Sequence, residues 1–198
     1  MAPTPSVNAS CRAAVGRAVV AGVLLILCGV AHAESLLGRV VGVTDGDTVT
    51  VLDAAKAQHK VRLAGIDAPE KGQPFGERSK ENLSRLVFGR DVRVDWHKKD
   101  RYGRLIGTAW VASPDAACVG KPDCRKTLDA GLAQLTVGLA WHYKKYAHEQ
   151  EPQQRGQYAF AEEEARGKRV GLWKDPNPVP PWEWRGAKRS SNGNAPRG

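Results

Sequence analysis

Apolar and polar residues alternate along much of the first half of the chain, which is the pattern of strands with one face buried. Five such segments are short, rich in β-branched residues and separated by turn residues, so each predicts a β-strand. They span residues 36–43, 48–52, 60–66, 92–96 and 105–111.

The hydrophobic period changes from two to about 3.6 in three other segments, which predicts helices. Residues 77–87 have one apolar face, and Gly89 follows where a helix would end. Leucines recur at helical spacing across 128–139, and a mostly polar helix is expected over 152–166. Between the fifth strand and the second helix, residues 112–126 have the composition of a long loop.

The predicted order is β-β-β-α-β-β-α-α, which indicates an α+β protein. Five strands with a helix between the third and the fourth is the order of a partly open, five-stranded Greek-key barrel of the OB type. Such barrels often bind oligonucleotides, although a fold alone does not define a function.

Residues 1–33 are predicted to be a cleaved signal peptide. Arg12 and Arg17 precede an apolar run over 19–30, and Ala31-His32-Ala33 follows as a small-x-small cleavage pattern. The apolar run is shorter than the ~20 residues of a membrane span. We therefore expect an exported protein, secreted or periplasmic, with no stable membrane association.

The remaining chain is expected to form one domain over 34–174 and a flexible tail over 175–198. Four prolines between positions 176 and 181 oppose regular structure, and a basic Gly/Ser/Asn-rich end follows. A monomer is the default expectation for one small domain.

The chain is basic, with 30 Lys and Arg against 21 Asp and Glu, a net charge of +9. Without the two arginines of residues 1–33, 28 basic and 21 acidic residues remain, a net charge of +7. This excess fits a polyanionic partner such as nucleic acid, and it equally fits simple solubility.

Cys118 and Cys124 are the two cysteines outside the predicted leader. In an exported protein this pair favours a disulfide that closes a surface loop, with free thiols as the alternative. A zinc site is disfavoured, because no further Cys or His ligand lies near the pair in sequence.

Carboxylates gather in two short motifs. Asp45 and Asp47 flank a glycine and would project to the same side of an extended segment, although Asp-Gly is also a good hairpin turn. In Asp67-Ala68-Pro69-Glu70 the proline turns the chain and brings the two acids toward a common point; an acidic turn that caps the next helix is the alternative. Oxygen ligands of this kind suit a hard divalent cation.

Two arginines accompany these motifs: Arg62 within the third strand and Arg104 at the start of the fifth. A guanidinium fork can bind two phosphate oxygens and stabilise the charge of a five-coordinate transition state. Carboxylates for a cation beside guanidinium groups for a phosphate indicate a phosphodiesterase site.

The chain resembles staphylococcal-nuclease-type thermonucleases over roughly residues 36–173. The motifs that carry the resemblance are Val-Thr-Asp-Gly-Asp-Thr-Val (43–49), Val-Arg-Leu-Ala-Gly-Ile-Asp-Ala-Pro-Glu (61–70), Asp-Arg-Tyr-Gly-Arg (100–104), Val-Gly-Leu-Ala (137–140) and Val-Gly-Leu-Trp (170–173). The resemblance implies a calcium-dependent endonuclease for DNA and RNA that attacks phosphorus in line with water and leaves 3′-phosphate ends. The residues alone do not distinguish Ca²⁺ from Mg²⁺.

The resemblance also implies residue roles. Asp47, Asp67 and the backbone carbonyl of Ala68 would be metal ligands, with Asp45 nearby as an indirect contributor, and a threonine of the best-known member is replaced by Ala68. Glu70 would orient or deprotonate the attacking water, while Arg62 and Arg104 would bind the phosphate. Base stacking falls to Tyr143 or Tyr146, with Lys144 or Lys145 near a phosphate; the alternative is that these aromatics belong to the core and the lysines are solvated.

Two rival functions stay open at this stage. Relatives of this fold also occur as binding modules without catalysis, and these should lack parts of the carboxylate and arginine set. An exported structural or adhesion domain would leave that set unexplained.

Overall fold

A computed structural model of the chain describes residues 34–118, 120–121 and 123–193. The predicted signal peptide and the last five residues of the predicted tail lie outside the described residues. No helix in the described part of the chain is both long and apolar enough to cross a membrane.

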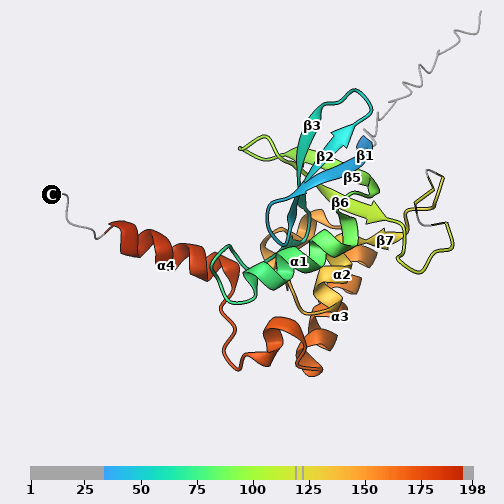
Figure 1. Cartoon of the computed structure of the whole chain (residues 1–198). Coiled ribbons are helices and arrows are strands. Elements are labelled where there is room, and N and C mark those ends of the chain that lie inside the picture. The colour runs from blue at the N-terminus through green and yellow to red at the C-terminus, as the bar shows by residue number, and fades with distance from the viewer. Residues whose placement is uncertain (1–33, 119, 122, 194–198) are drawn as a thin grey trace, which may run out of the picture. The chain divides into compact units, whose positions relative to one another are not determined.

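The strands form a closed, mixed β-barrel (Figure 1). One sheet runs in the order β3-β2-β1-β5-β6-β7, and a parallel pairing of β3 with β6 closes five of its strands on themselves. The strands of this sheet are β1 (Glu34–Val43), β2 (Thr48–Asp53), β3 (Gln58–Leu63), β5 (Asp91–Lys99), β6 (Leu105–Val111) and β7 (Leu128–Asp129). The alternation of buried and exposed residues along β6 shows how the barrel core is filled, since every second side chain of this strand points inward.

Two further short strands pair outside the barrel. β4 (Ile66–Asp67) and β8 (Trp141–His142) form an antiparallel pair between segments about 75 positions apart in the sequence. This pair ties the segment after β3 to the segment after the second helix.

In the view of Figure 1 most of the helices lie below the barrel, and the last one projects to the left. They are α1 (Gly76–Val87), α2 (Ala130–Thr136), α3 (Pro152–Gly167) and α4 (Pro181–Gly193), with short 3-10 helices η1 (Lys144–Glu149) and η2 (Gly171–Lys174). Asp129 caps α2 by accepting hydrogen bonds from the N–H groups of Gly131 and Leu132. α3 begins with a proline, whose fixed φ suits the first turn of a helix.

The two Val-Gly-Leu motifs meet in space. The N–H of Leu172 donates to the carbonyl of Gly138 at 2.8 Å. A Cβ on Gly171 would lie 2.0 Å from that carbonyl oxygen, and the φ of Gly171 is +58°, so only glycine fits there. This contact joins the end of α2 to the start of η2.

The α+β class, the OB-type barrel and the strand order are confirmed, and the barrel is closed where the sequence predicted a partly open one. The predicted strand 60–66 is divided into β3 and β4, and the predicted helix 128–139 is the short strand β7 followed by the shorter α2. The absence of regular structure expected after position 175 is wrong for the part that forms α4.

Candidate active site

The Asp45-Gly46-Asp47 segment lies between β1 and β2 and is held against α1 and α2. A Cβ on Gly46 would lie 1.9 Å from Oγ of Ser79, so the glycine is required by close packing. Gln134 of α2 fixes the same point, because its Nε2 donates to the carbonyl of Gly46 at 2.8 Å. The segment is therefore a turn whose backbone is held by contacts with both helices, and these contacts fix the position of the neighbouring Asp47.

Arg62 joins the two carboxylate motifs. Thr48 and Arg62 are paired across β2 and β3, so the side chain of Asp47 lies beside that of Arg62. Nη1 of Arg62 lies 2.7 Å from Oδ2 of Asp47 as an ion pair, although its angle is not that of a hydrogen bond. Nη2 donates to Oδ1 of Asp67 at 2.8 Å. One guanidinium thus holds Asp47 and Asp67 on either side of it.

Asp67 and Glu70 converge as the turn between them predicts. The N–H of Ala68 donates to Oδ2 of Asp47 at 3.0 Å, which fixes the turn against the first motif. The N–H of Glu70 donates to Oε1 of Gln73 at 2.9 Å. Both carboxylates contact the same arginine, Arg185: its Nη2 lies 2.7 Å from Oδ2 of Asp67, and its Nη1 donates to Oε1 of Glu70.

Burial and crowding change the protonation of this cluster. Burial, together with the charge of Asp47, raises the pKa of Asp45 to about 7. Burial also raises the pKa of Asp67, although hydrogen bonds from Arg185 and the charge of Arg62 act in the opposite direction. Burial works against the charged form of Arg62, but the charges of Asp47 and Asp67 outweigh it and raise the pKa of Arg62. Arg62 is therefore a fixed cation at any working pH.

Arg104 lies next to this cluster along the barrel but is paired elsewhere. Ile106 of β6 is in register with Arg62 of β3, and Arg104 directly precedes β6, two positions before Ile106. Its Nε and Nη2 bind Oδ2 of Asp100 at 2.8 and 2.7 Å. The structure thus brings Asp47, Arg62, Asp67 and Glu70 together, and it places Arg104 directly before the adjoining strand β6 with Asp100 as its partner.

Three of the four residues proposed to contact nucleic acid, Tyr143, Lys144 and Lys145, line a cavity of about 430 Å³, whereas Tyr146 is not one of its lining residues. Trp141 and Trp182 also line this cavity. Tyr146 packs edge-on against Tyr143, with ring centroids 5.4 Å apart. Trp141 is buried in a small core with Trp173, whereas Tyr143 lines the cavity, so base stacking by Tyr143 stays a prediction.

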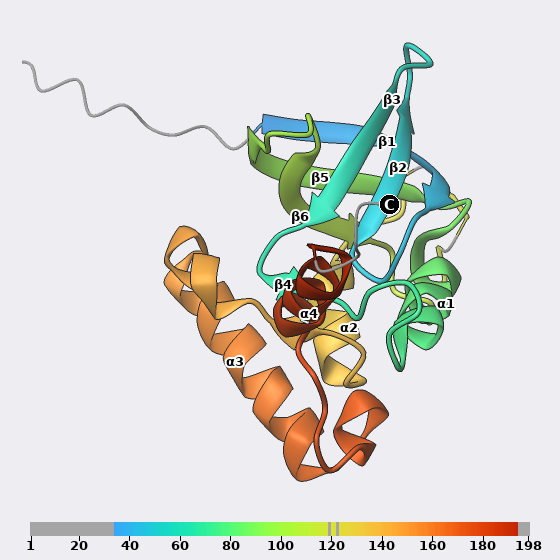
Figure 2. The ribbon, with the colours of Figure 1, turned by 90° about the vertical axis from the view of Figure 1, so that its left-hand side faces the viewer.

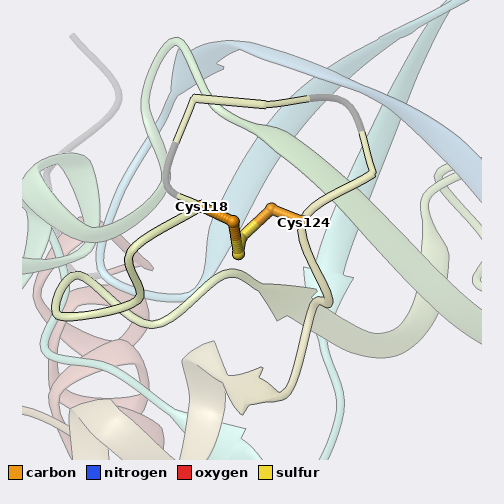
Figure 3. The surroundings of a disulfide bond; sticks show 2 residues. All are labelled: Cys118 and Cys124. Atoms are coloured by element: carbon orange, nitrogen blue, oxygen red, sulfur yellow. A yellow bond between two sulfur atoms is a disulfide. The ribbon is translucent and has the colours of Figure 1, made fainter.

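Cys118 and Cys124 form a disulfide in the long loop after β6 (Figure 3). The bond closes a loop with a sequence separation of six residues.

The prediction from sequence missed Arg185, which is the closest cationic partner of Glu70, and it missed Gln134. The signal for Arg185 was present, because Pro181 at the start of a helix with Glu183 in its first turn is a favourable helix beginning. The run of prolines before it opposes regular structure, which conceals the helix in the sequence. Gln134 offered no local signal, since its partner Gly46 lies 88 positions away.

Comparison with known proteins gives the family. A family model described as staphylococcal nuclease homologue matches residues 60–175. The chain is 44% identical to Protein ParB of Escherichia coli over 176 aligned residues. The alignment covers 89% of this chain and 92% of that protein. It is 39% identical to a micrococcal nuclease of Shigella flexneri over 176 aligned residues, and that alignment covers 88% of this chain and 94% of that protein. The chain belongs to the staphylococcal nuclease family.

A plant member of the staphylococcal nuclease family is also similar. The Staphylococcal-like nuclease CAN1 of Arabidopsis thaliana is 40% identical over 133 residues, 67% of this chain and 35% of that protein. The protein is accordingly a nuclease of the staphylococcal nuclease family, with nucleic acid as its substrate class. The matched range 60–175 includes Arg62, Asp67, Glu70 and Arg104, whereas α4 lies beyond it.

Family membership suggests a metal requirement, and the donor set fits a hard cation. No group of three or more His, Cys, Asp or Glu side chains among the described residues is arranged to hold a metal ion. The guanidinium of Arg185 stands instead against Asp67 and Glu70, which shows that a positive charge is accommodated there. Carboxylate oxygens without nitrogen or sulfur ligands suit Ca²⁺ or Mg²⁺.

Proposed function

We propose that this protein is an exported, calcium-dependent nuclease that hydrolyses phosphodiester bonds of DNA and RNA. In this proposal water attacks phosphorus in line with the leaving 5′ oxygen, so the products carry 3′-phosphate ends. The observation that carries the proposal is the position of Arg62 between Asp47 and Asp67, with Glu70 beside Asp67. Export rests on residues 1–33, and N-terminal sequencing of the exported protein should begin at Glu34.

The proposed metal ligands are Asp47, Asp67 and the carbonyl of Ala68. Asp45 contributes at one remove, because its Oδ1 accepts the N–H of Asp47 at 3.1 Å and so fixes the backbone of that residue. A bound divalent cation would polarise a phosphoryl oxygen and hold negative charge at the site. These ligands come from the end of the β1–β2 turn and from β4, which are joined by the hydrogen bond from Ala68 to Asp47.

The chain's own groups supply orientation and charge. Glu70 would accept a hydrogen bond from the attacking water and receive its proton as the bond to phosphorus forms. Arg62 is partly buried, with 15% of its side chain exposed, and its position is fixed by two carboxylates, so it is preorganised for a phosphate oxygen. Arg104 binds Asp100 through Nε and Nη2, and its Nη1 would approach the phosphate from the position directly before β6.

The cavity beside the cluster would take a nucleobase. Tyr143 offers a ring face, Tyr146 packs against that ring, and Lys144 and Lys145 supply positive charge for the backbone. Stacking on aromatic rings is tolerant of sequence, because every base has a π face. This arrangement supports binding of both DNA and RNA.

The test is digestion of single-stranded DNA, duplex DNA and RNA by the purified protein with Ca²⁺, with Mg²⁺ or with excess chelator. We expect cleavage with Ca²⁺, and 5′ ends that polynucleotide kinase labels without prior dephosphorylation. Cleavage that persists in chelator would overturn the metal mechanism. Products that need dephosphorylation before labelling would contradict the proposal that the bond between phosphorus and the 5′ oxygen is cleaved.

Glu70→Gln separates an enzyme from a binding module. The variant should bind single-stranded DNA and cleave it at least about 10²-fold more slowly, since it loses the proton acceptor. Glu77→Gln makes the same change at an exposed position of α1 and should cleave like the unchanged protein. Equal rates for the two variants would remove Glu70 from the mechanism.

A further inference from the structure

The first turns of α4 lie over the acidic cluster. Figure 2 shows α4 nearly end-on in front of β4, the strand that carries Asp67. Arg185 is the contact residue: its Nη1 lies 3.2 Å from Oδ1 and its Nη2 lies 2.7 Å from Oδ2 of Asp67. Nη1 also donates to Oε1 of Glu70 at 2.5 Å.

These contacts use the oxygens that a metal ion would need. Oδ1 of Asp67 accepts from both Arg62 and Arg185, and Oδ2 accepts from Arg185. Asp67 is fully buried, so it has no solvent-facing oxygen in reserve. A guanidinium and a divalent cation at the same carboxylate would also repel each other. Arg185 and a metal ion therefore compete for Asp67.

The same helix covers the proposed base site. The ring of Trp182 is stacked on Tyr143, with centroids 5.6 Å apart and planes inclined by 25°. Trp182 also meets Trp141 edge-on at 5.7 Å. A nucleobase stacked on this face of Tyr143 would have to displace Trp182. The helix α4 therefore blocks both the proposed metal site at Asp67 and the proposed base site at Tyr143.

The attachment of α4 is local, which allows it to leave without disturbing the barrel. Nε2 of Gln73 donates to the carbonyl of Val179 at 2.7 Å, and Pro181 is buried where the helix begins. Beyond Arg185 the residues from Ala187 to Ser190 are exposed. Residues 175–180, with three prolines, join α4 to η2 without regular structure.

We propose that α4 is an autoinhibitory strap in which Arg185 takes the place of the metal ion and Trp182 takes the place of a base. A divalent cation together with a nucleic acid strand displaces the strap and completes the active site. This inference rests on the proposed function, because it requires that Asp67 binds the metal. Without both ligands the protein is held in a closed, inactive form.

The test measures Ca²⁺ binding by calorimetry, without nucleic acid, in the unchanged protein and in Arg185→Ala. Removal of the competing cation should tighten Ca²⁺ binding about fivefold or more, the range of coupling between linked sites. Arg189→Ala is the matched control, since it removes the same charge from an exposed position of the same helix. Trp182→Ala should also tighten Ca²⁺ binding, because it loosens the strap without changing charge.

Hydrogen exchange of residues 181–190 gives a second readout that does not depend on activity. The amides of α4 should be protected without metal and lose protection when Ca²⁺ and an oligonucleotide are added. If Ca²⁺ binds the unchanged protein and Arg185→Ala equally well and α4 stays protected, the strap is overturned while the nuclease proposal stands. Slower cleavage by Arg185→Ala with unchanged Ca²⁺ affinity would make Arg185 a phosphate-binding residue and overturn the strap. If none of the variants binds Ca²⁺, the proposed function fails and the strap fails with it.

Discussion

At the scale of single residues, the candidate site has an excess of negative charge. It contains four carboxylates and two arginines, so the cluster carries a formal charge of −2 when every group is ionised. Burial, together with the charge of Asp47, raises the pKa of Asp45 to about 7. The groups are Asp45, Asp47, Asp67, Glu70, Arg62 and Arg185. A divalent cation in place of the single charge of Arg185 would bring the cluster closer to neutrality, which is a physical reason for the exchange proposed above.

Arg104 provides a test of the phosphate site at this scale. Arg104→Ala should lower kcat about 10²-fold, the usual cost of one preorganised donor to the transition state. Arg104→Lys should recover only part of the loss, because lysine lacks the planar fork. The measurement is single-turnover cleavage of a short single-stranded DNA with saturating Ca²⁺.

The control for Arg104 lies in the same turn. The guanidinium of Arg101 packs over the ring of Tyr102 at 4.8 Å and is exposed, so Arg101→Ala removes a neighbouring charge without touching Asp100. If Arg101→Ala and Arg104→Ala slow cleavage equally, the effect is one of general charge, and the specific role of Arg104 is wrong.

Sequence motifs can indicate which residues lie together where their spacing is local. Asp67 and Glu70 are three positions apart around a proline, and the structure brings both to one guanidinium. Motifs could not predict the hydrogen bonds between distant segments that hold these residues in place. Oγ of Ser79 donates to the carbonyl of Leu139, and Nε2 of Gln134 donates to that of Ser79, across 60 and 55 positions. Neither contact has a local pattern in the sequence.

At the scale of elements, strands were predictable where they are long and alternate. β6 extends over Leu105–Val111, the predicted range, because every second residue is buried. β4 and β8 have two residues each and exist only through their pairing with each other, so no periodicity reveals them. α4 was missed because its helix begins directly after a run of prolines that otherwise opposes regular structure.

A buried hydrogen bond joins α3 to the residue that caps α2. The hydroxyl of Tyr158 donates to Oδ2 of Asp129 at 2.8 Å, and Asp129 is the residue that caps α2. Tyr158→Phe should lower the free energy of unfolding by about 1–3 kcal/mol, because it removes a donor from a buried acceptor. Denaturant unfolding at pH 7 measures this change.

The cost of Tyr158→Phe should also depend on pH. Burial raises the pKa of Asp129 in the folded state, and the hydroxyl of Tyr158 works against that rise by stabilising the ionised form. The folded pKa therefore rises further in the variant, and stability is lost as pH climbs above the unfolded value. The loss should be larger at pH 7 than at pH 4. Phe160→Ala, at an exposed position of α3, should change stability by no more than about 0.5 kcal/mol; an equal loss from both variants would contradict the hydrogen-bond account.

At the scale of the whole molecule, the net charge of +9 favours association with a polyanion. This attraction acts over distances up to the screening length of the salt solution. Arg62 lies in β3 and Arg104 directly before the adjacent strand β6, while Lys144 and Lys145 line the cavity together with its aromatic residues. Charge from separate elements would thus follow one strand of nucleic acid.

Salt dependence tests whether these charges meet phosphates. With Glu70→Gln to prevent cleavage, the logarithm of the association constant for a labelled single-stranded 12-mer should fall linearly with the logarithm of salt concentration. Each phosphate contact contributes a slope of about −0.7, so roughly three contacts give about −2. Lys145→Ala should reduce the slope by one contact. Lys168→Ala, whose ammonium pairs with Glu164 on the surface of α3, should leave it unchanged. An affinity that is constant between about 50 and 200 mM salt would contradict the electrostatic account, because released counterions must appear as a slope.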